Sequence, residues 1–239
     1  MTIFKKPISM PLPPEPFVIH GGCNCKAIRY EISVPEHSER PLTPYKTPGA
    51  DVGDLRIPAV YMDHCNDCRR ATSSILPMAL VAEIETVRVS ILLASSEAEG
   101  PFEIEDSDRK WTPAVEMFDF NNPSLKDLCL SVYKSTPQRS RWFCRRCGTM
   151  VAYSVDPGVV PPEWKWPAML DIWLGTVDRE DLEKEYMSPE RILWCEKGVP
   201  WIRKLARSGA GGVPEHPLTK IDKLVGDDVQ ADLEELAGV

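Results

Sequence analysis

The chain has 239 residues, 43% of them hydrophobic, and its 36 acidic and 28 basic side chains give a formal charge of −8. An acidic chain is poorly suited to bind nucleic-acid phosphates, so we expect no nucleic-acid partner. No apolar run is long enough for a secretory signal or a membrane span. We therefore expect a cytoplasmic protein without membrane contact, in which thiols stay reduced.

Proline is frequent, with 23 residues against 14 glycines, and this favours many loops and short strands over long helices. Residues 1–16 are expected to form an extended, proline-rich segment, and residues 20–25 a glycine-rich turn. Apolar and polar residues then alternate over residues 28–34, which predicts a half-buried strand. Residues 35–58 hold five prolines and few large apolar side chains, so we expect a long surface loop there.

The middle of the chain is mainly β in pattern. The acidic segment 95–122 contains several aromatic residues, among them Phe102 and Phe118, so we expect it to fold back over the body. Apolar runs predict seven further strands, at residues 59–62, 75–82, 87–93, 128–133, 150–153, 169–174 and 192–195.

The last third of the chain contains the predicted helices. Asp178 is a candidate N-cap for a short helix at 179–186, and residues 197–201 are expected to turn. After a linker at 208–212, apolar residues recur at helical spacing over 225–236, which predicts an amphipathic helix. We therefore divide the chain into a proline-rich segment, a β domain that holds all eight cysteines, and a linker with a C-terminal helix, at residues 1–16, 17–205 and 206–239.

Six of the eight cysteines fall in three close pairs: Cys23/Cys25, Cys65/Cys68 and Cys144/Cys147. Packing alone does not require such spacing, whereas two thiols two or three residues apart can bind one metal ion, and zinc suits thiolate ligands best. Reduced core cysteines and redox pairs are the alternatives. Six thiolates can close one four-thiolate site and leave a pair that needs a third ligand. Spacing alone does not say which pairs join. Cys129 and Cys195, in apolar runs, are expected in the core.

Three motifs contain these pairs: His20-Gly21-Gly22-Cys23-x-Cys25, His64-Cys65-x-x-Cys68-Arg69 and Arg141-x-Phe143-Cys144-x-x-Cys147-Gly148-Thr149. In this order they resemble the signature of the glutathione-dependent formaldehyde-activating enzyme and centromere protein V family. Two later segments, Leu174-Gly175-Thr176-Val177-Asp178 and Lys197-x-x-Pro200-Trp201, are similar to the family's closing segments. The resemblance covers about residues 17–205, with long insertions at 35–58 and 95–127.

The resemblance implies a mainly β fold of the β-tent type, built around a structural zinc that is held by Cys23, Cys25, Cys144 and Cys147. It also implies a second zinc, held by a Cys-His-Cys-x-x-Cys stretch whose histidine, here His64, is not a ligand. In this chain Asp63 replaces the leading cysteine. A carboxylate can bind zinc, so Asp63, Cys65 and Cys68 remain candidate ligands with one position open, although the change could also weaken or abolish the site.

The family's reaction interconverts glutathione and formaldehyde with S-hydroxymethylglutathione. We therefore expect a zinc-dependent carbon–sulfur lyase that acts on a small molecule or on a glutathione adduct, with glutathione itself a candidate substrate. Asp63 and His64 are candidate catalytic residues, and Arg69 is a candidate for binding a substrate carboxylate. Two alternatives remain: a lyase or isomerase of secondary metabolism that uses Asp63 as acid or base without thiol exchange, and a non-catalytic zinc module that binds a partner protein. The oligomeric state stays open, with a homodimer as one option.

Five further side chains, two arginines and three tryptophans, are weaker candidates for a role. Arg70 could bind a substrate, but a solvated turn or an ion pair is the simpler interpretation. Arg141 is expected to anchor the loop of the third thiol pair. The loop tryptophans at positions 111, 164 and 166 could line a pocket or simply pack.

Overall fold

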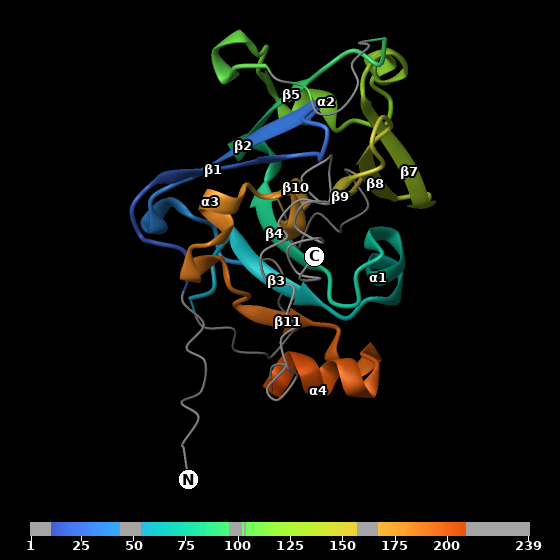
Figure 1. Ribbon diagram of the computed structural model, residues 1–239. Helices are drawn as coiled ribbons and strands as arrows, with labels where there is room; N and C mark the ends of the chain where they lie inside the picture. The colour runs from blue at the N-terminus through green and yellow to red at the C-terminus, as the bar shows by residue number, and fades with distance from the viewer. Residues whose placement is uncertain (1–10, 44–53, 96–101, 103, 157–166, 209–239) are drawn as a thin grey trace, which may run out of the picture. The chain divides into compact units, whose positions relative to one another are not determined.

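The structure is a computed structural model that describes residues 11–43, 54–95, 102, 104–156 and 167–208 (Figure 1). The chain divides into two compact units, residues 1–202 and 203–239. The described part of the second unit is the end of helix α4 (Pro200–Ser208). The C-terminal helix expected at 225–236 lies outside the described residues, as do Trp164 and Trp166.

The first unit is mainly β and contains two sheets. The smaller sheet has the order β1-β2-β5-β6 and is antiparallel throughout. Its strands are β1 (Phe17–Gly22), β2 (Ile28–Val34), β5 (Val87–Ile91) and β6 (Thr112–Pro113). In Figure 1, β1 and β2 are the blue strands and lie beside β5.

The larger sheet has the order β11-β3-β4-β10-β9-β8-β7, and its pairs are antiparallel except for β11 with β3. Its strands are β3 (Ala59–Asp63), β4 (Met78–Glu83), β7 (Leu130–Thr136), β8 (Arg139–Cys144), β9 (Met150–Val155), β10 (Met169–Trp173) and β11 (Arg191–Leu193).

Short helices connect the strands. They are α1 (Asn66–Thr72), α2 (Ala114–Met117) and α3 (Arg179–Leu182). None of the helices in the described part of the chain has the length and apolar character needed to cross a bilayer.

The main core forms between the two sheets, because each sheet turns one apolar face toward the other. Ile19 and Tyr30 of the smaller sheet belong to the same buried cluster as Leu80, Trp142 and Ile172 of the larger sheet. Alternate residues of a strand point to opposite faces. On β4, accordingly, the odd-numbered neighbours of Leu80 belong to two smaller clusters on the other face. We call the face toward the main core the inner face and the other the outer face.

Strand β8 shows this division most clearly. Trp142 and Cys144 belong to the main core on the inner face, so Arg141 and Phe143, which alternate with them, face outward. The pairing of β8 with β9 shifts register between Trp142 and Phe143, where Ala152 and Met150 are the partners. Such a bulge adds one residue and changes which side chains of β9 share a face. Met150 consequently packs with the outer cluster, on the same side as Phe143.

Most of the predicted strands are present, and the differences have simple physical causes. Residues 20–22 are not a turn but the end of β1, because they pair with residues 29–31 of β2. The segment 35–58 is not a simple surface loop: Arg40 and Ile57 are buried, and the Arg40 guanidinium donates to the carbonyls of Pro35 and Leu12.

Three further expectations near the end of the chain need correction. Residues 200 and 201 are not part of a turn, because α4 begins at Pro200, a residue well suited to a first helical turn. Asp178 is the N-cap residue of α3, but its carboxylate does not cap the helix and instead accepts two hydrogen bonds from Arg29. Cys195 is half-buried in a 3-10 turn after β11, not in a core strand.

The acidic segment with aromatic residues does fold back, as expected. Phe102 and Phe118 are both buried in the main core. The Phe102 amide donates to the Cys25 carbonyl at 2.9 Å, and the Phe118 ring meets Trp142 edge-on at 5.1 Å between centroids. The insertion therefore covers the region of the first and third thiol pairs.

Candidate metal centres

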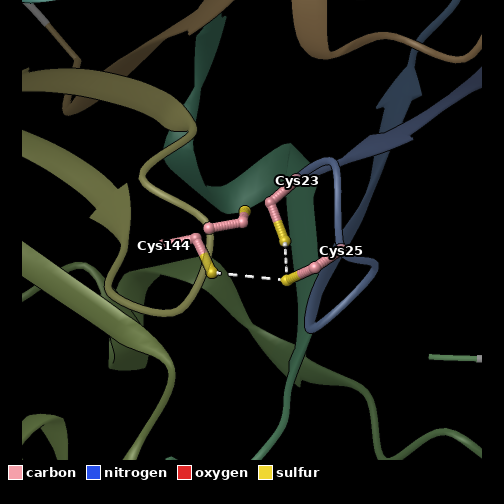
Figure 2. A group of neighbouring side chains, drawn as sticks. Cys23, Cys25 and Cys144 are labelled. Carbon is pink, nitrogen blue, oxygen red and sulfur yellow. Dashed lines mark hydrogen bonds between the residues drawn. The ribbon is translucent and has the colours of Figure 1, made fainter. Parts of the chain in front are cut away.

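Four cysteines from distant parts of the chain meet beside the main core: Cys23 and Cys25, from the turn between β1 and β2, and Cys144 and Cys147, from the turn between β8 and β9. Their sulfur atoms all lie within 4.8 Å of one another. Figure 2 shows Cys23, Cys25 and Cys144 pointing toward one another, with 3.6 Å between the first two sulfurs and 3.7 Å from Cys25 to Cys144. All eight cysteines are free thiols. The expected convergence is confirmed. We call these residues the four-cysteine centre.

The backbone of both turns holds the sulfurs in place. Gly148 has φ of 75°, a conformation that glycine adopts without strain, and its amide donates to the Cys144 carbonyl at 2.8 Å. Lys26 turns the first loop with φ of 60°, a role that no sequence motif indicated. The Ile28 amide then donates to the Cys23 sulfur at 3.2 Å. Each turn thus points its thiols toward the other pair.

The geometry of this centre fits a tetrahedral thiolate-bound metal. Zinc–sulfur bonds of about 2.3 Å place the sulfurs of a regular tetrahedron about 3.8 Å apart, close to the separations found here. A hydrogen bond from Cys23 lowers the pKa of Cys144 to about 5, and the same hydrogen bond raises the pKa of Cys23. The two thiols therefore share a proton that a metal ion would displace. Burial raises the pKa of Cys25, and the guanidinium of Arg146, stacked at 4.4 Å over Phe102, opposes that shift.

A second group, which we call the three-ligand centre, lies at the end of β3 and the start of α1. A carboxylate oxygen of Asp63 and the sulfurs of Cys65 and Cys68 lie within 4.8 Å of one another. The Cys65 amide donates to Asp63 Oδ1 at 2.7 Å, which holds the carboxylate beside the thiols. His64 is buried but belongs to neither ligand group. Its amide donates to the Leu193 carbonyl at 3.2 Å, so β11 supports this loop.

The two thiols of this centre also share a proton. A hydrogen bond with Cys68 lowers the pKa of Cys65 to about 6, with further help from the Cys68 and Asp67 amides. The same hydrogen bond, then burial, raises the pKa of Cys68. At neutral pH the pair therefore carries one thiolate next to Asp63. Two thiolates and a carboxylate are three ligands that zinc accepts, with the fourth tetrahedral position left for water or a substrate.

Arg141 connects this centre to the larger sheet. It is 3% exposed, and its Nη1 donates to the Cys68 sulfur at 3.4 Å. Its Nε donates to Ser135 at 3.3 Å, and its guanidinium lies 4.6 Å from the centre of the Tyr153 ring. We expected Arg141 to anchor the loop of the third thiol pair; among the described contacts it reaches the second pair instead, because residues 141 and 144 lie on opposite faces of β8.

Asp171 of β10 was not anticipated as part of this region. Burial, followed by the negative charge of Asp63, raises its pKa to about 7, while Arg141 opposes the shift. The available signal was a single acidic residue inside the apolar run 169–174, where a buried charge needs compensation.

A cavity of about 600 Å³ lies beside the three-ligand centre. Its floor is the outer face of β7, β8 and β9, and its wall is α1. The lining residues are Asp67, Arg70, Ala71, Tyr133, Ser135, Arg141, Phe143, Gly148 and Met150. Arg70 is among them and Arg69 is not, so the substrate-binding role of Arg69 stays a prediction. Trp111, expected as a pocket or packing residue, is half-buried with Arg88 stacked at 5.1 Å from its ring centre.

The remaining cysteines take no part in either group. Cys129 is buried, as expected, and its thiol donates to the Leu93 carbonyl, whereas Cys195 donates to the Ile192 carbonyl. A comparison with models of known protein families finds none that matches this chain, and a comparison with curated proteins finds no significant relative. Function must therefore be inferred from the two cysteine groups and the cavity beside them.

Proposed function

We propose that this protein is a zinc-dependent enzyme of the carbon–sulfur lyase type that acts on a small thiol adduct. The three-ligand centre is its reactive site, and the four-cysteine centre is a structural zinc site within a fold of the β-tent type. The observation that carries the proposal is the contrast between the two groups. One has four ligands and is enclosed by the core, whereas the other has three ligands and lies next to a cavity.

Each group of this chain has a role that follows from its surroundings. A zinc ion held by Asp63, Cys65 and Cys68 would supply a Lewis-acidic position for a substrate sulfur or carbonyl oxygen. Two thiolates and a carboxylate carry three negative charges, one more than the two positive charges of such an ion. Arg141 compensates that negative charge through its hydrogen bond to Cys68, and its burial keeps water from weakening the interaction.

The order of the cysteine motifs supports glutathione chemistry as the first reaction to test, because it resembles that of the glutathione-dependent formaldehyde-activating family. The departure at Asp63 supports a second candidate, in which this carboxylate moves protons and no thiol is exchanged. The hydrogen bond from the Cys65 amide occupies one carboxylate oxygen and leaves the other available for a metal or a proton.

Metal analysis of Asp63 variants separates these functions. We expect about two zinc ions per chain for the wild type, about one for Asp63→Ala, and recovery of the second in Asp63→Cys. Formation of S-hydroxymethylglutathione from formaldehyde and glutathione should fall with the second zinc and return with it. One zinc ion in every variant, with no turnover, would favour a non-catalytic module, and turnover that survives Asp63→Ala with unchanged metal would remove Asp63 from the mechanism.

A further inference from the structure

The cavity beside the three-ligand centre combines positive charge with an apolar surface. We propose that it binds a small organic molecule with one carboxylate joined to an apolar body, and that Arg70 pairs with the carboxylate. The inference deepens the proposed function and rests on it in one respect, because Arg141 lines this cavity and also contacts Cys68 of the proposed zinc centre. The substrate class follows from charge, from side-chain chemistry and from the place of each lining residue.

Arg70 is the cation of this cavity that is available to a ligand. It lies on the exposed side of α1, three residues after Asp67, and i, i+3 neighbours of a helix share one face. Within the described residues, its side chain has no hydrogen bond or ion pair. By contrast, two other exposed arginines are paired, Arg88 with Glu31 and Arg179 with Glu183. A guanidinium matches a carboxylate through two parallel hydrogen bonds.

The charges of the lining favour a monoanion. Arg70 and Arg141 contribute two positive charges and Asp67 one negative charge. Arg141 is already committed to the Cys68 sulfur, so its charge is shared with the three-ligand centre. With Arg141 assigned to that centre, Arg70 and Asp67 leave no net charge in the lining. A single carboxylate can therefore be recognised through its contact with Arg70, whereas a phosphate monoester would place a second negative charge near Asp67.

The rest of the lining fits an apolar body. Ala71, Phe143 and Met150 present carbon and sulfur surfaces, and Phe143 and Met150 are only half-buried. Tyr133 is 64% exposed, and its ring offers a further apolar surface with a hydroxyl at the edge. A cavity of about 600 Å³ is within the range that encloses small ligands. A bound ligand would therefore cover side chains that now face water.

A matched pair of probes tests the inference: 3-phenylpropanoate and its neutral amide, titrated calorimetrically into the zinc-loaded full chain. We expect the carboxylate to bind about tenfold more tightly than the amide, because a charge-assisted contact is added. Arg70→Gln should remove that preference and Arg70→Glu should reverse it. Arg139→Gln should keep it, because Arg139 lies on the same strand as Arg141 but does not line the cavity.

Three outcomes would overturn the inference. The first is equal affinity for the two probes. The second is a preference that persists in Arg70→Gln, because the carboxylate would then bind elsewhere. The third is tighter binding of phenyl phosphate than of 3-phenylpropanoate. Titration of Asp63→Ala separates this inference from the proposed function. A preference that survives there supports recognition by Arg70 even if the second zinc and turnover are absent, whereas its loss there would show that the metal binds the carboxylate.

Discussion

Replacing Arg141 by methionine should weaken metal binding at the three-ligand centre and leave the four-cysteine centre intact. The substitution keeps most of the side-chain volume and removes the charge that contacts Cys68 at 3.4 Å. A hydrogen bond to a charged group contributes about 1.5–3 kcal/mol, which corresponds to a loss of affinity of about 10- to 150-fold. The upper part of that range is expected, because Arg141 is 3% exposed and a buried negative charge without its partner is costly.

Competition titration with a chromophoric zinc chelator measures this effect, because it resolves a tight and a weaker site in the same protein. Arg139→Met is the matched control, since Arg139 is exposed on the same strand and should leave both affinities unchanged. Equal weakening of both sites in Arg141→Met would indicate general damage to the fold. Unchanged affinity at the weaker site would refute the electrostatic role given to Arg141.

Two further predictions concern stability. Burial raises the pKa of Glu190 from 4.5 to about 7. The loss of folding stability from burying the ionised carboxylate is therefore absent below about pH 4.5, grows as the pH rises, and is complete above about pH 7. Glu190→Gln should therefore stabilise the protein by about 1–2 kcal/mol at pH 8 and by little at pH 4 in urea unfolding; an equal gain at both pH values would contradict this. In Gly21→Ala, the new Cβ would overlap Tyr30 Oη and the Thr176 carbonyl, so we expect a loss of about 1–3 kcal/mol. Gly175→Ala, which meets open space, should have no comparable effect in the same thermal or urea melt.

The strand pattern and the grouping of thiols could be predicted because both depend on local spacing. Alternation at residues 28–34 identified β2, and the close spacing within each thiol pair indicated the two ligand groups. Strand β1 was missed at residues 20–22 because glycines favour turns locally, and only pairing with β2 overrides that preference. Strand β8 was hidden by its arginines, which are rare in buried strands unless a partner such as Cys68 compensates the charge.

The positions of the site residues depended on information that spacing does not contain. The four cysteines were brought together on the strength of a family resemblance, and their mutual distances agree with it. Arg141 was assigned to the nearest thiol pair in the sequence, yet the pleat of β8 directs it to the other pair. The choice between Arg69 and Arg70 depends on how α1 is rotated against the sheet, and the helix is too short for hydrophobic periodicity to reveal that rotation.

Strand β8 makes the two centres inseparable. Cys144 faces the main core and Arg141 faces the three-ligand centre, three positions apart on a ribbon whose side chains alternate. A one-residue shift in the register of β8 against β7 and β9 would exchange these directions. The Cys144 thiol would then face outward, and the Arg141 guanidinium would point into the apolar core. An insertion or deletion in this short stretch would therefore abolish both centres at once, whereas the same change in the loops that flank it could be absorbed.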